Sequence, residues 1–262
     1  MHADPITAEK LAASLTAETV ELLPYLPYLL QDLWVLGTPP QCVERLIRAH
    51  IPAPGSRRFL DLGCGKGAVA VKIAQTFRAE AVGVDLMPEF IEAAVAKAEE
   101  HGVSDLCRFR VGDVKVAVEV ERGYDCVIWG AVGNVLGGPE ETLTKLLPTV
   151  RPGGYVIIDD AYLAEDGAAA RYRPCEFLTR DQWRRIFAGC GAAILEEAVA
   201  DADEQARDNA DDLGRIESRA GELAALYPEL KALFEGYVAS QNKEIDDLAD
   251  ALVGAVWLLR KQ

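Results

Sequence analysis

The chain has 262 residues, half of them hydrophobic and about a quarter charged, which is typical of a globular protein with one large α/β domain and additions. The formal net charge is −15 and the pI is about 4.7. Nucleic acid is therefore not expected as a partner, because its phosphates require clustered Lys and Arg. The six cysteines show no Cys-x-x-Cys or Cys/His spacing, so we expect no metal site and reduced thiols in an intracellular core.

The N-terminal segment, residues 1–50, is expected to form a helical cap whose helices are broken at Pro24, Pro27 and the Pro39-Pro40 pair. Its first residues lack a charged region followed by an apolar run. No apolar stretch of the chain reaches the ~20 residues that a membrane span requires. We therefore expect a cytoplasmic protein that has no signal peptide and does not bind membranes.

Three aromatic residues in the middle of this cap have two interpretations. Tyr25, Tyr28 and Trp34 belong to the apolar sequence YLPYLLQDLWVL. Core packing is the commoner role of such side chains. A cap that folds over a ligand would instead place them in an apolar substrate pocket.

Residues 51–200 alternate short apolar strands with amphipathic helices, which predicts a mostly parallel sheet covered on both faces. Such sheets bind ligands at the carboxyl ends of their strands. The sequence RPGG is expected to turn before the fifth strand. The predicted strands are 59–62, 81–85, 107–111, 124–130, 154–163 and 192–200, and the predicted helices are 66–77, 88–101, 139–150 and 181–190. The apolar face expected on the second helix comprises Phe90, Ile91, Ala94, Val95 and Ala98.

Residues 201–248 are strongly acidic and carry apolar side chains at steps of three and four on both sides of Pro228, which predicts a helical hairpin. Each apolar stripe favours packing within the chain, and a homodimer contact through these helices is the alternative. Residues 249–262 contain LVGAVWLLR, which predicts a final, seventh strand.

A glycine-rich loop follows the first predicted strand, in the sequence RFLDLGCGKG. Gly63, Gly65 and Gly67 allow a ligand to lie against bare main chain at the start of a helix. Asp85 ends the second strand, where a carboxylate accepts hydrogen bonds from a ribose diol, and Asp113 follows the third strand, where it can accept from an adenine amine. Together these features predict an adenosine site. In the simpler interpretation, Asp85 caps the next helix and Asp113 is a turn residue.

The residue two positions before the first glycine helps to identify the ligand. Gly63, Gly65 and Ala68 also satisfy the dinucleotide pattern G-x-G-x-x-G/A, so the loop alone leaves a nicotinamide cofactor open. Asp61, however, would repel a pyrophosphate, whereas it suits a ligand with an ammonium and a sulfonium.

The series DLGCGKG, GVDL, GDV, YDCVIWG and LLPTVRPGGYVIIDD resembles the ordered motifs of class I S-adenosylmethionine-dependent methyltransferases, in particular those that act on small molecules. The resemblance covers about residues 58–200. It implies a doubly wound, mostly parallel, seven-stranded Rossmann-like sheet with the last strand antiparallel and the helical hairpin inserted before that strand. It also implies S-adenosyl-L-methionine as cofactor and S-adenosyl-L-homocysteine as its product.

The resemblance further implies which residues hold the cofactor. Asp61 would lie near the methionine amine, Asp85 on the ribose hydroxyls and Asp113 on the adenine amine, while Leu86 packs on adenine and Val114 offers its amide. The implied residues are Asp61, Gly63, Cys64, Gly65, Asp85, Leu86, Asp113, Val114, Gly130 and Ala131, the last two beside the methyl-transfer site.

Methyl transfer from a sulfonium is an in-line displacement, so the protein's main task is to align the acceptor and exclude water. A base is needed only if the acceptor must lose a proton. Asp160, Tyr162 and Asn134 are candidates by position, although Asp159-Asp160 could also end the strand as a solvated turn. Tyr172 is a weaker candidate and is grouped with the aromatic residues of the substrate pocket.

The acceptor is expected to be a small, partly apolar metabolite. The sequence WGAVG after the fourth strand differs from the Asn/Asp-Pro-Pro-Tyr/Phe signature of enzymes that methylate amide or adenine nitrogens. The sequence leaves open whether oxygen, nitrogen, sulfur or carbon is methylated. The alternatives are a nicotinamide-dependent oxidoreductase and a non-catalytic S-adenosylmethionine-binding or interaction module.

Overall fold

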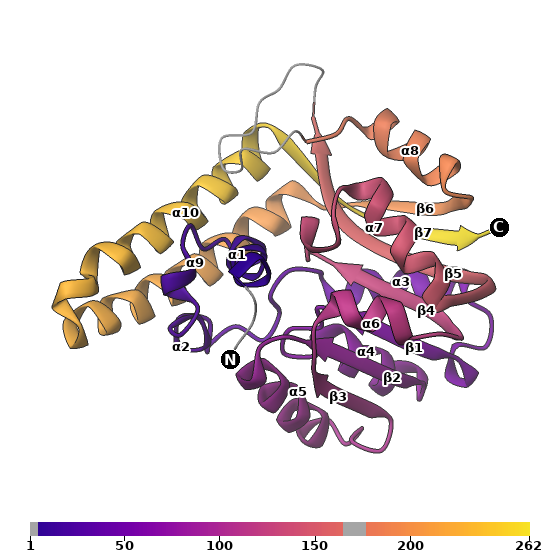
Figure 1. Ribbon diagram of the computed structural model, residues 1–262, viewed down its shortest axis with the longest axis horizontal. Coiled ribbons are helices and arrows are strands. Elements are labelled where there is room, and N and C mark those ends of the chain that lie inside the picture. The colour runs from indigo at the N-terminus through magenta and orange to yellow at the C-terminus, as the bar shows by residue number, and fades with distance from the viewer. Residues whose placement is uncertain (1–4, 165–176) are drawn as a thin grey trace. The chain divides into compact units, whose positions relative to one another are not determined.

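The computed structural model of the chain describes residues 5–164 and 177–262 (Figure 1). Its centre is a seven-stranded sheet in the order β3-β2-β1-β4-β5-β7-β6. The strands are β1 (Arg58–Leu62), β2 (Glu80–Asp85), β3 (Cys107–Val111), β4 (Tyr124–Gly130), β5 (Val150–Leu163), β6 (Ala192–Val199) and β7 (Leu252–Lys261). The sheet is mostly parallel with an antiparallel end strand and has helices on both sides, so the predicted fold class is confirmed.

The strand order reverses at β1, which pairs in parallel with β2 on one side and β4 on the other. A chain that winds outward in both directions from one strand leaves a switch point at that strand's carboxyl end. The glycine loop starts there, because it follows Leu62 directly and leads into α4 (Ala68–Phe77).

Helices α3 (Pro40–His50) and α4 cover one face of the sheet. Their apolar side chains pack on alternate residues of the strands, among them Phe59, Ile128 and Ile157. Side chains two residues apart on a strand share a face. On each of these three strands, the side chain two residues beyond the core residue therefore lies on the same face of the sheet.

The other helices of the sheet region are α5 (Pro88–Glu100), α6 (Val114–Val120), α7 (Pro139–Leu146) and α8 (Arg180–Gly189). Helix α6 was not expected from the sequence. Two expectations in this region are wrong. RPGG lies inside β5 rather than in a turn, with Gly153 at φ 71° and a register shift opposite Tyr124 and Cys126. Val95 on α5 is 43% exposed rather than part of the buried face.

The chain divides into two compact units. The sheet unit comprises Trp34–Asp160, Asp181–Ala198 and Ala255–Gln262. The helical unit comprises the described residues of Met1–Leu33, Ala161–Arg180 and Val199–Gly254. Helix α3 thus groups with the sheet, whereas the predicted cap extended to residue 50. The predicted scheme of cap, core, hairpin and final strand stays a prediction.

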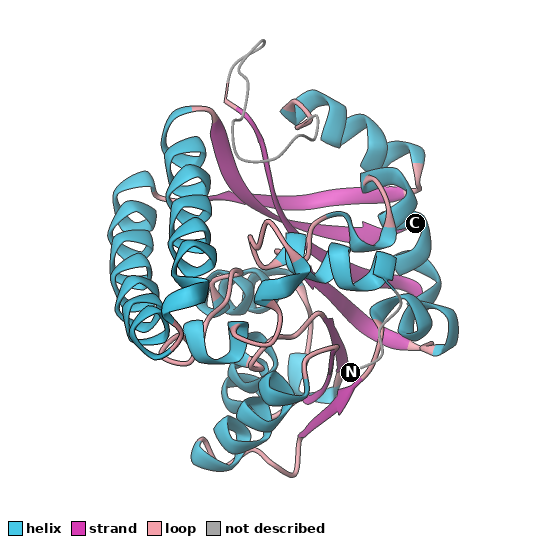
Figure 2. Cartoon of the chain, turned by 60° about the vertical axis from the view of Figure 1, so that its left-hand side comes forward, coloured by secondary structure: helices cyan, strands magenta, loops and turns pink. Residues whose placement is uncertain are grey.

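The helical unit contains α1 (Pro5–Ser14), α2 (Leu26–Leu29), α9 (Ala202–Leu226) and α10 (Lys231–Asp250). Helices α9 and α10 lie side by side as a hairpin (Figure 2). The hairpin buries Ile216 and Leu223 of α9 and Phe234 and Tyr237 of α10 within the chain. This burial agrees with intramolecular packing of the stripes, and a homodimer contact through the hairpin stays a prediction.

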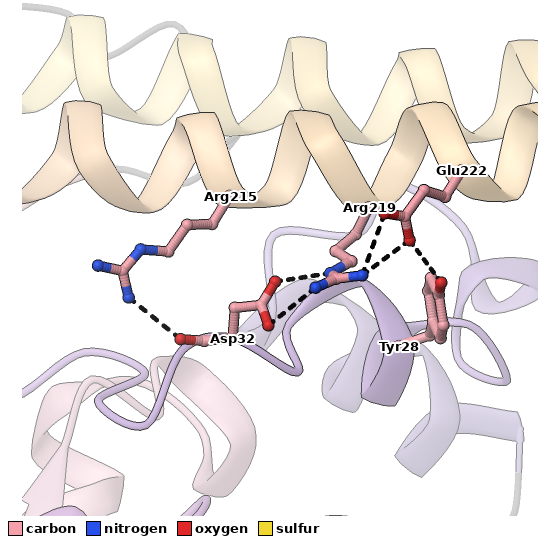
Figure 3. Close-up of polar contacts among 5 residues, drawn as sticks. All are labelled: Tyr28, Asp32, Arg215, Arg219 and Glu222. Atoms are coloured by element: carbon pink, nitrogen blue, oxygen red, sulfur yellow. Dashed lines mark hydrogen bonds and ion pairs between the residues drawn. The ribbon is translucent and has the colours of Figure 1, made fainter.

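A polar network joins the N-terminal segment to α9 (Figure 3). The Arg219 guanidinium donates to both carboxylate oxygens of Asp32, at 2.6 and 3.1 Å, and to Glu222. The Tyr28 hydroxyl donates to Glu222, and Arg215 donates to the Asp32 carbonyl at 3.2 Å. Because the network is exposed, its ion pairs contribute little to stability, and the bidentate geometry chiefly fixes the orientation of the segment.

No helix within residues 5–164 and 177–262 is both long and apolar enough to cross a membrane.

Candidate cofactor and acceptor site

The glycine loop is a tight strand-to-helix connection that needs glycine for two reasons. Gly63, Gly65 and Gly67 all have positive φ, at 74°, 50° and 75°, where L side chains are strained. Space is also short: a Cβ at Gly67 would lie 2.8 Å from the Phe109 ring and 2.9 Å from Ala94 Cβ. The bare main chain therefore follows from backbone angle and packing together.

Asp61 lies under this loop with an unsatisfied carboxylate oxygen. The residue is 4% exposed, and its Oδ2 has no hydrogen-bond partner in the described part of the chain. Burial, together with the nearby charge of Asp85, raises the pKa of Asp61 to about 7, against a lowering by a backbone hydrogen bond at Ala70. A buried carboxylate without a donor is unfavourable, and a cationic amine would satisfy both its charge and its lone pairs.

Asp85 joins two loops at the end of β2. Its Oδ2 accepts from the Gly65 amide at 2.8 Å, and its Oδ1 accepts from the Met87 amide at 2.9 Å. Burial raises its pKa, and these amides oppose the rise. Each carboxylate oxygen retains a second lone pair, so the residue can hold the glycine loop and still accept from ribose hydroxyls.

Asp113 caps α6, since its Oδ1 accepts from the Lys115 amide at 2.8 Å. It lies just beyond β3, which pairs in parallel with β2 so that Asp85 faces Val111. The structure thus brings Asp61, Asp85 and Asp113 to the ends of three neighbouring parallel strands, which is where the sequence placed an adenosine site. The half-buried Leu86 and the buried Val114 lie at the same strand ends.

Cys64 fills space between the loop and β2. Its sulfur is buried, and a Cβ on Gly83 would lie 2.8 Å from it. Burial raises the pKa of this thiol far above its usual value, which keeps it protonated. The side chain therefore packs beside the glycine loop, and a role of Cys64 in cofactor binding stays a prediction. Within the described residues, no group of three or more His, Cys, Asp or Glu could hold a metal ion.

The end of β4 is closely covered by residues 36–38, a segment that sequence analysis did not single out. A Cβ on Gly130 would lie 2.2 Å from the Thr38 hydroxyl, and a Cβ on Gly37 would lie 2.5 Å from Ala131 Cβ. Leu36 reaches over the glycine loop, 3.3 Å from a Cβ built on Gly65. Glycine at position 130 therefore makes room for this covering segment, and Ala131 follows with φ 55°.

Asp159, at the point where β5 passes Gly130, is the residue that sequence analysis passed over in favour of its neighbour. It pairs in register with Gly130, and its carbonyl accepts from the Ala131 amide at 3.2 Å. Burial is the main cause that raises its pKa to about 7, with a further contribution from Asp160. The signal in the sequence was the two-residue alternation, because Ile157 faces the core under α3 and Asp159 is the next residue on that face.

The candidate bases from the sequence lie in different places. Asn134 is exposed at the start of a 3₁₀ turn after β4, and Asp160 is half-buried on β5. Tyr162 is buried and belongs to the helical unit, and Tyr172 lies outside the described residues. Their catalytic roles stay predictions.

The aromatic residues of the cap make packing contacts in both units. The Trp34 Nε1 donates to the Lys66 carbonyl at 3.0 Å, and its ring stacks on His101 at 4.9 Å. Tyr25 packs edge-on against Phe234, and Tyr28 is 40% exposed in the network with Glu222. These contacts favour the core-packing interpretation, and the substrate-pocket role of the three residues stays a prediction.

Comparison with known proteins shows the family to which the chain belongs. The family model described as "Methyltransferase domain" matches residues 55–213, more than half of the chain. The ribosomal protein L11 methyltransferase of Photobacterium profundum is 28% identical over 137 residues, which are 50% of this chain and 44% of that protein. The chain therefore spans less than half the length of this curated relative.

Two solved structures share the fold over nearly their whole length. They are S-adenosylmethionine-dependent methyltransferases of Thiobacillus denitrificans and Geobacter sulfurreducens, both in complex with S-adenosyl-L-homocysteine. Their TM-scores are 0.76 and 0.75 and their identities 20% and 21%, and each comparison covers 91% of this chain and 98% of the other. The chain accordingly belongs to the methyltransferase domain family, and its fold is that of the class I S-adenosylmethionine-dependent methyltransferases.

Proposed function

We propose that the chain transfers a methyl group from S-adenosylmethionine to a small, partly apolar metabolite. The observation that supports the cofactor most directly is the Asp61 carboxylate, which is buried under the glycine loop with one oxygen unsatisfied. A nicotinamide dinucleotide would bring a pyrophosphate to this carboxylate, whereas the amine of S-adenosylmethionine would neutralise it. S-adenosylmethionine, when bound, supplies a methyl group that its positive sulfur has already activated.

The residues of the chain would hold the cofactor from three strand ends. Asp61 would accept from the methionine amine, Asp85 from the ribose hydroxyls and Asp113 from the adenine amine. Residues 36–38 would exclude water from the space beside Gly130 and Ala131, because they already lie against this part of the sheet. Excluding water and aligning the acceptor is the main catalytic work that such a transfer leaves to a protein.

The binding half of the proposal is tested by calorimetry. Wild-type protein should bind S-adenosylhomocysteine, and Asp61→Asn and Asp85→Asn should each weaken that binding by roughly 10- to 100-fold, the usual cost of losing a charge-assisted hydrogen bond. Asp105→Asn is the matched control, because the Asp105 side chain is 68% exposed and the residue is distant in sequence from the glycine loop. NADH should give no heat. Binding of NADH, or equal affinity in wild type and Asp61→Asn, would contradict the cofactor assignment.

A protein acceptor is the second candidate. The relative from Photobacterium profundum is named for a ribosomal protein, and the strongly acidic chain would attract a basic protein. Against this, the match with that relative covers 137 residues, only 50% of this chain and 44% of the relative. More than half of the relative's length has no counterpart in the match.

The two acceptor classes are separated by labelling. A cell extract is divided by ultrafiltration into a low-mass fraction and a protein fraction, and each is incubated with the enzyme and S-adenosylmethionine carrying a radioactive methyl group. Label in the low-mass fraction supports the metabolite, and label retained on protein supports the second candidate. The candidate bases Asp160, Tyr162 and Asn134 are then each replaced by Ala or Phe and assayed with the acceptor that is found. Replacing a true base should lower turnover and leave the affinity for S-adenosylhomocysteine unchanged.

A further inference from the structure

We propose that residues 34–38 form a strap that must open to admit the cofactor, and that the Trp34 ring is the latch that holds the strap shut. This inference rests on the proposed function, because it concerns access to the same site. Trp34 is thereby assigned as a positioning residue, which acts on the cofactor through its neighbours in the strap. Three features of the sheet unit carry the inference: the main chain of the strap, the surface that the strap covers, and the contacts of Trp34.

The strap is held without the main-chain hydrogen bonds of a helix or strand. Residues 34–38 lie in neither kind of element, between Leu33 and the start of α3 at Pro40. Within residues 5–164 and 177–262, no hydrogen bond of the strap involves its main chain. Segments of this kind open at a lower free-energy cost than helices and strands do. The strap can therefore move while α3 and the sheet stay folded.

The strap covers part of the main chain against which the cofactor would lie. A Cβ built on Gly65 would be 3.3 Å from Leu36 Cδ1 and 3.8 Å from Leu36 Cβ, so the Leu36 side chain is in van der Waals contact with this glycine. A Cβ built on Gly63 would be 2.6 Å from Val132 Cγ2, from the loop after β4. The bare main chain is thus already covered at two of its glycines. A cofactor that lies against it requires Leu36 to move aside.

Gly37 gives the strap a point about which it can rotate. Its φ is 152°, a backbone angle that L side chains rarely adopt, and a Cβ there would lie 2.5 Å from Ala131 Cβ. Glycine therefore permits the close approach to the end of β4 and also leaves the main chain free to turn. Pro39 and Pro40 fix φ on the side next to α3. Movement of the strap is thereby confined to the part between Trp34 and Gly37.

The Trp34 ring has a seat formed by α4, α5 and the turn after α5. The ring stacks on the His101 imidazole, with centroids 4.9 Å apart and planes inclined by 16°, and the Lys97 ammonium lies 5.1 Å from its centroid. The half-buried ring also packs on an apolar cluster that comprises Val71, Ala74, Ala98, Val103 and Cys107. Stacking, cation–π and apolar contacts therefore converge on this one side chain at the start of the strap.

Trp34 also joins the strap to the glycine loop. Its Nε1 donates to the Lys66 carbonyl at 3.0 Å, and Lys66 lies between Gly65 and Gly67 in the loop. Leu36 follows Trp34 by two residues, so a ring that leaves its seat releases the part of the strap that covers Gly65. The position of the ring therefore decides whether the strap is shut or free to open.

A latch has a kinetic consequence that simple packing lacks. When the strap shuts over both the free protein and the complex, a weaker latch raises the open fraction of both by the same factor. The cofactor then enters and leaves faster by that factor, and its Kd stays the same. Loss of a residue that only packs instead lowers stability, or changes Kd without equal changes in the two rates.

Surface plasmon resonance with S-adenosylhomocysteine tests this consequence on the full chain and requires no methyl acceptor. Trp34→Phe removes the hydrogen bond to the Lys66 carbonyl and keeps an aromatic ring. The association and dissociation rate constants should rise together by roughly 3- to 10-fold, the effect of one neutral hydrogen bond, while Kd stays within about 2-fold of wild type. His101→Ala removes the stacked ring from outside the strap and should raise both rates in the same way.

Tyr124→Phe is the matched control. It also removes one hydrogen bond from an aromatic side chain, since the Tyr124 hydroxyl donates to Glu121, but it lies at the start of β4, whereas the strap meets the end of that strand at Gly130. Its exchange rates should equal those of wild type. Acceleration of the same size in Tyr124→Phe would mean that the sheet unit loosens in general, and it would overturn the inference.

The same measurements separate this inference from the proposed function. Faster exchange at constant Kd in Trp34→Phe supports the latch. Unchanged rates, or a change in Kd that one rate alone accounts for, overturns the latch and leaves the methyltransferase proposal intact. Where Trp34→Phe does not fold, His101→Ala decides by the same criteria. If wild type does not bind S-adenosylhomocysteine, the proposed function fails, and the latch fails with it.

Discussion

Replacing Asp61 with Asn should stabilise the cofactor-free protein at alkaline pH and at the same time weaken cofactor binding. Both effects come from the burial and the unsatisfied carboxylate oxygen of Asp61. Asp61 is 4% exposed, one of its carboxylate oxygens has no partner in the described residues, and the Asp85 charge is nearby. The ionised Asp61 carboxylate therefore destabilises the folded protein until a cationic ligand binds.

The magnitude follows from the pKa. Burial raises the pKa of Asp61 from 3.8 to about 7, a difference of about 3 units, and each unit is worth 1.36 kcal/mol. Because the folded pKa lies above the unfolded one, the folded protein binds more protons between about pH 4 and pH 7. Stability therefore falls as pH rises through this window and levels off above pH 7, at a total cost of up to about 4 kcal/mol. Asn stays neutral throughout, but its amide hydrogens need acceptors, so we expect a net gain of about 1–3 kcal/mol at pH 8.

The assay is urea unfolding of both proteins without cofactor at pH 5 and pH 8. Other buried groups, such as Asp159, titrate in the same window but are common to both proteins, so the difference between the two proteins reports Asp61 together with its interaction with Asp85. The variant should exceed wild type at pH 8 by more than at pH 5. S-adenosylhomocysteine at 100 times the wild-type Kd should then stabilise wild type by about 2.7 kcal/mol and the variant, whose affinity is roughly 10- to 100-fold weaker, by only about 0.4–1.4 kcal/mol. A stability difference that is the same at both pH values would refute the reasoning, because it would mean that Asp61 is not strained by its charge.

Three further predictions concern packing. Gly67→Ala should destabilise the protein by about 1–3 kcal/mol in urea unfolding, because φ is 75° and the new Cβ would lie 2.8 Å from Phe109; an unchanged midpoint would show that the loop can relax. Gly130→Ala should lower turnover about 10-fold or more by displacing Thr38, and adding Thr38→Ala should restore part of it; no loss in the single variant would mean that residues 36–38 do not need this position. Asp125→Ala should lower the free energy of unfolding by about 3–5 kcal/mol in thermal or urea unfolding. The reason is that the buried Asp125 carboxylate pairs with Arg57 and Arg151 and accepts from the Arg58 amide at 2.9 Å. A loss below about 1 kcal/mol would show that these charges are solvated.

Local patterns in the sequence were sufficient to predict the sheet and the glycine loop. Strand–helix alternation, the glycine spacing and Asp61, Asp85 and Asp113 are local patterns, because backbone angles and the apolar period of two or 3.6 are set within a few residues. The hairpin of α9 and α10 was predictable for the same reason. Where two local interpretations of Asp85 competed, the structure shows that its carboxylate holds the glycine loop and the next helix together.

The surroundings of the carboxyl end of β4 could not be predicted from the sequence, because they are made by contacts between distant segments. The contact of Thr38 with Gly130 joins residues about 90 positions apart, and no local pattern in either segment predicts it. Whether Asp159 or Asp160 lies on the same face as Asp61 depends on which face of β5 meets α3, and therefore on strand register rather than on residue type. The pKa of Asp159 likewise depends on the atoms that replace water around its carboxyl, and one of those groups, the Thr38 hydroxyl, comes from a segment distant in the sequence.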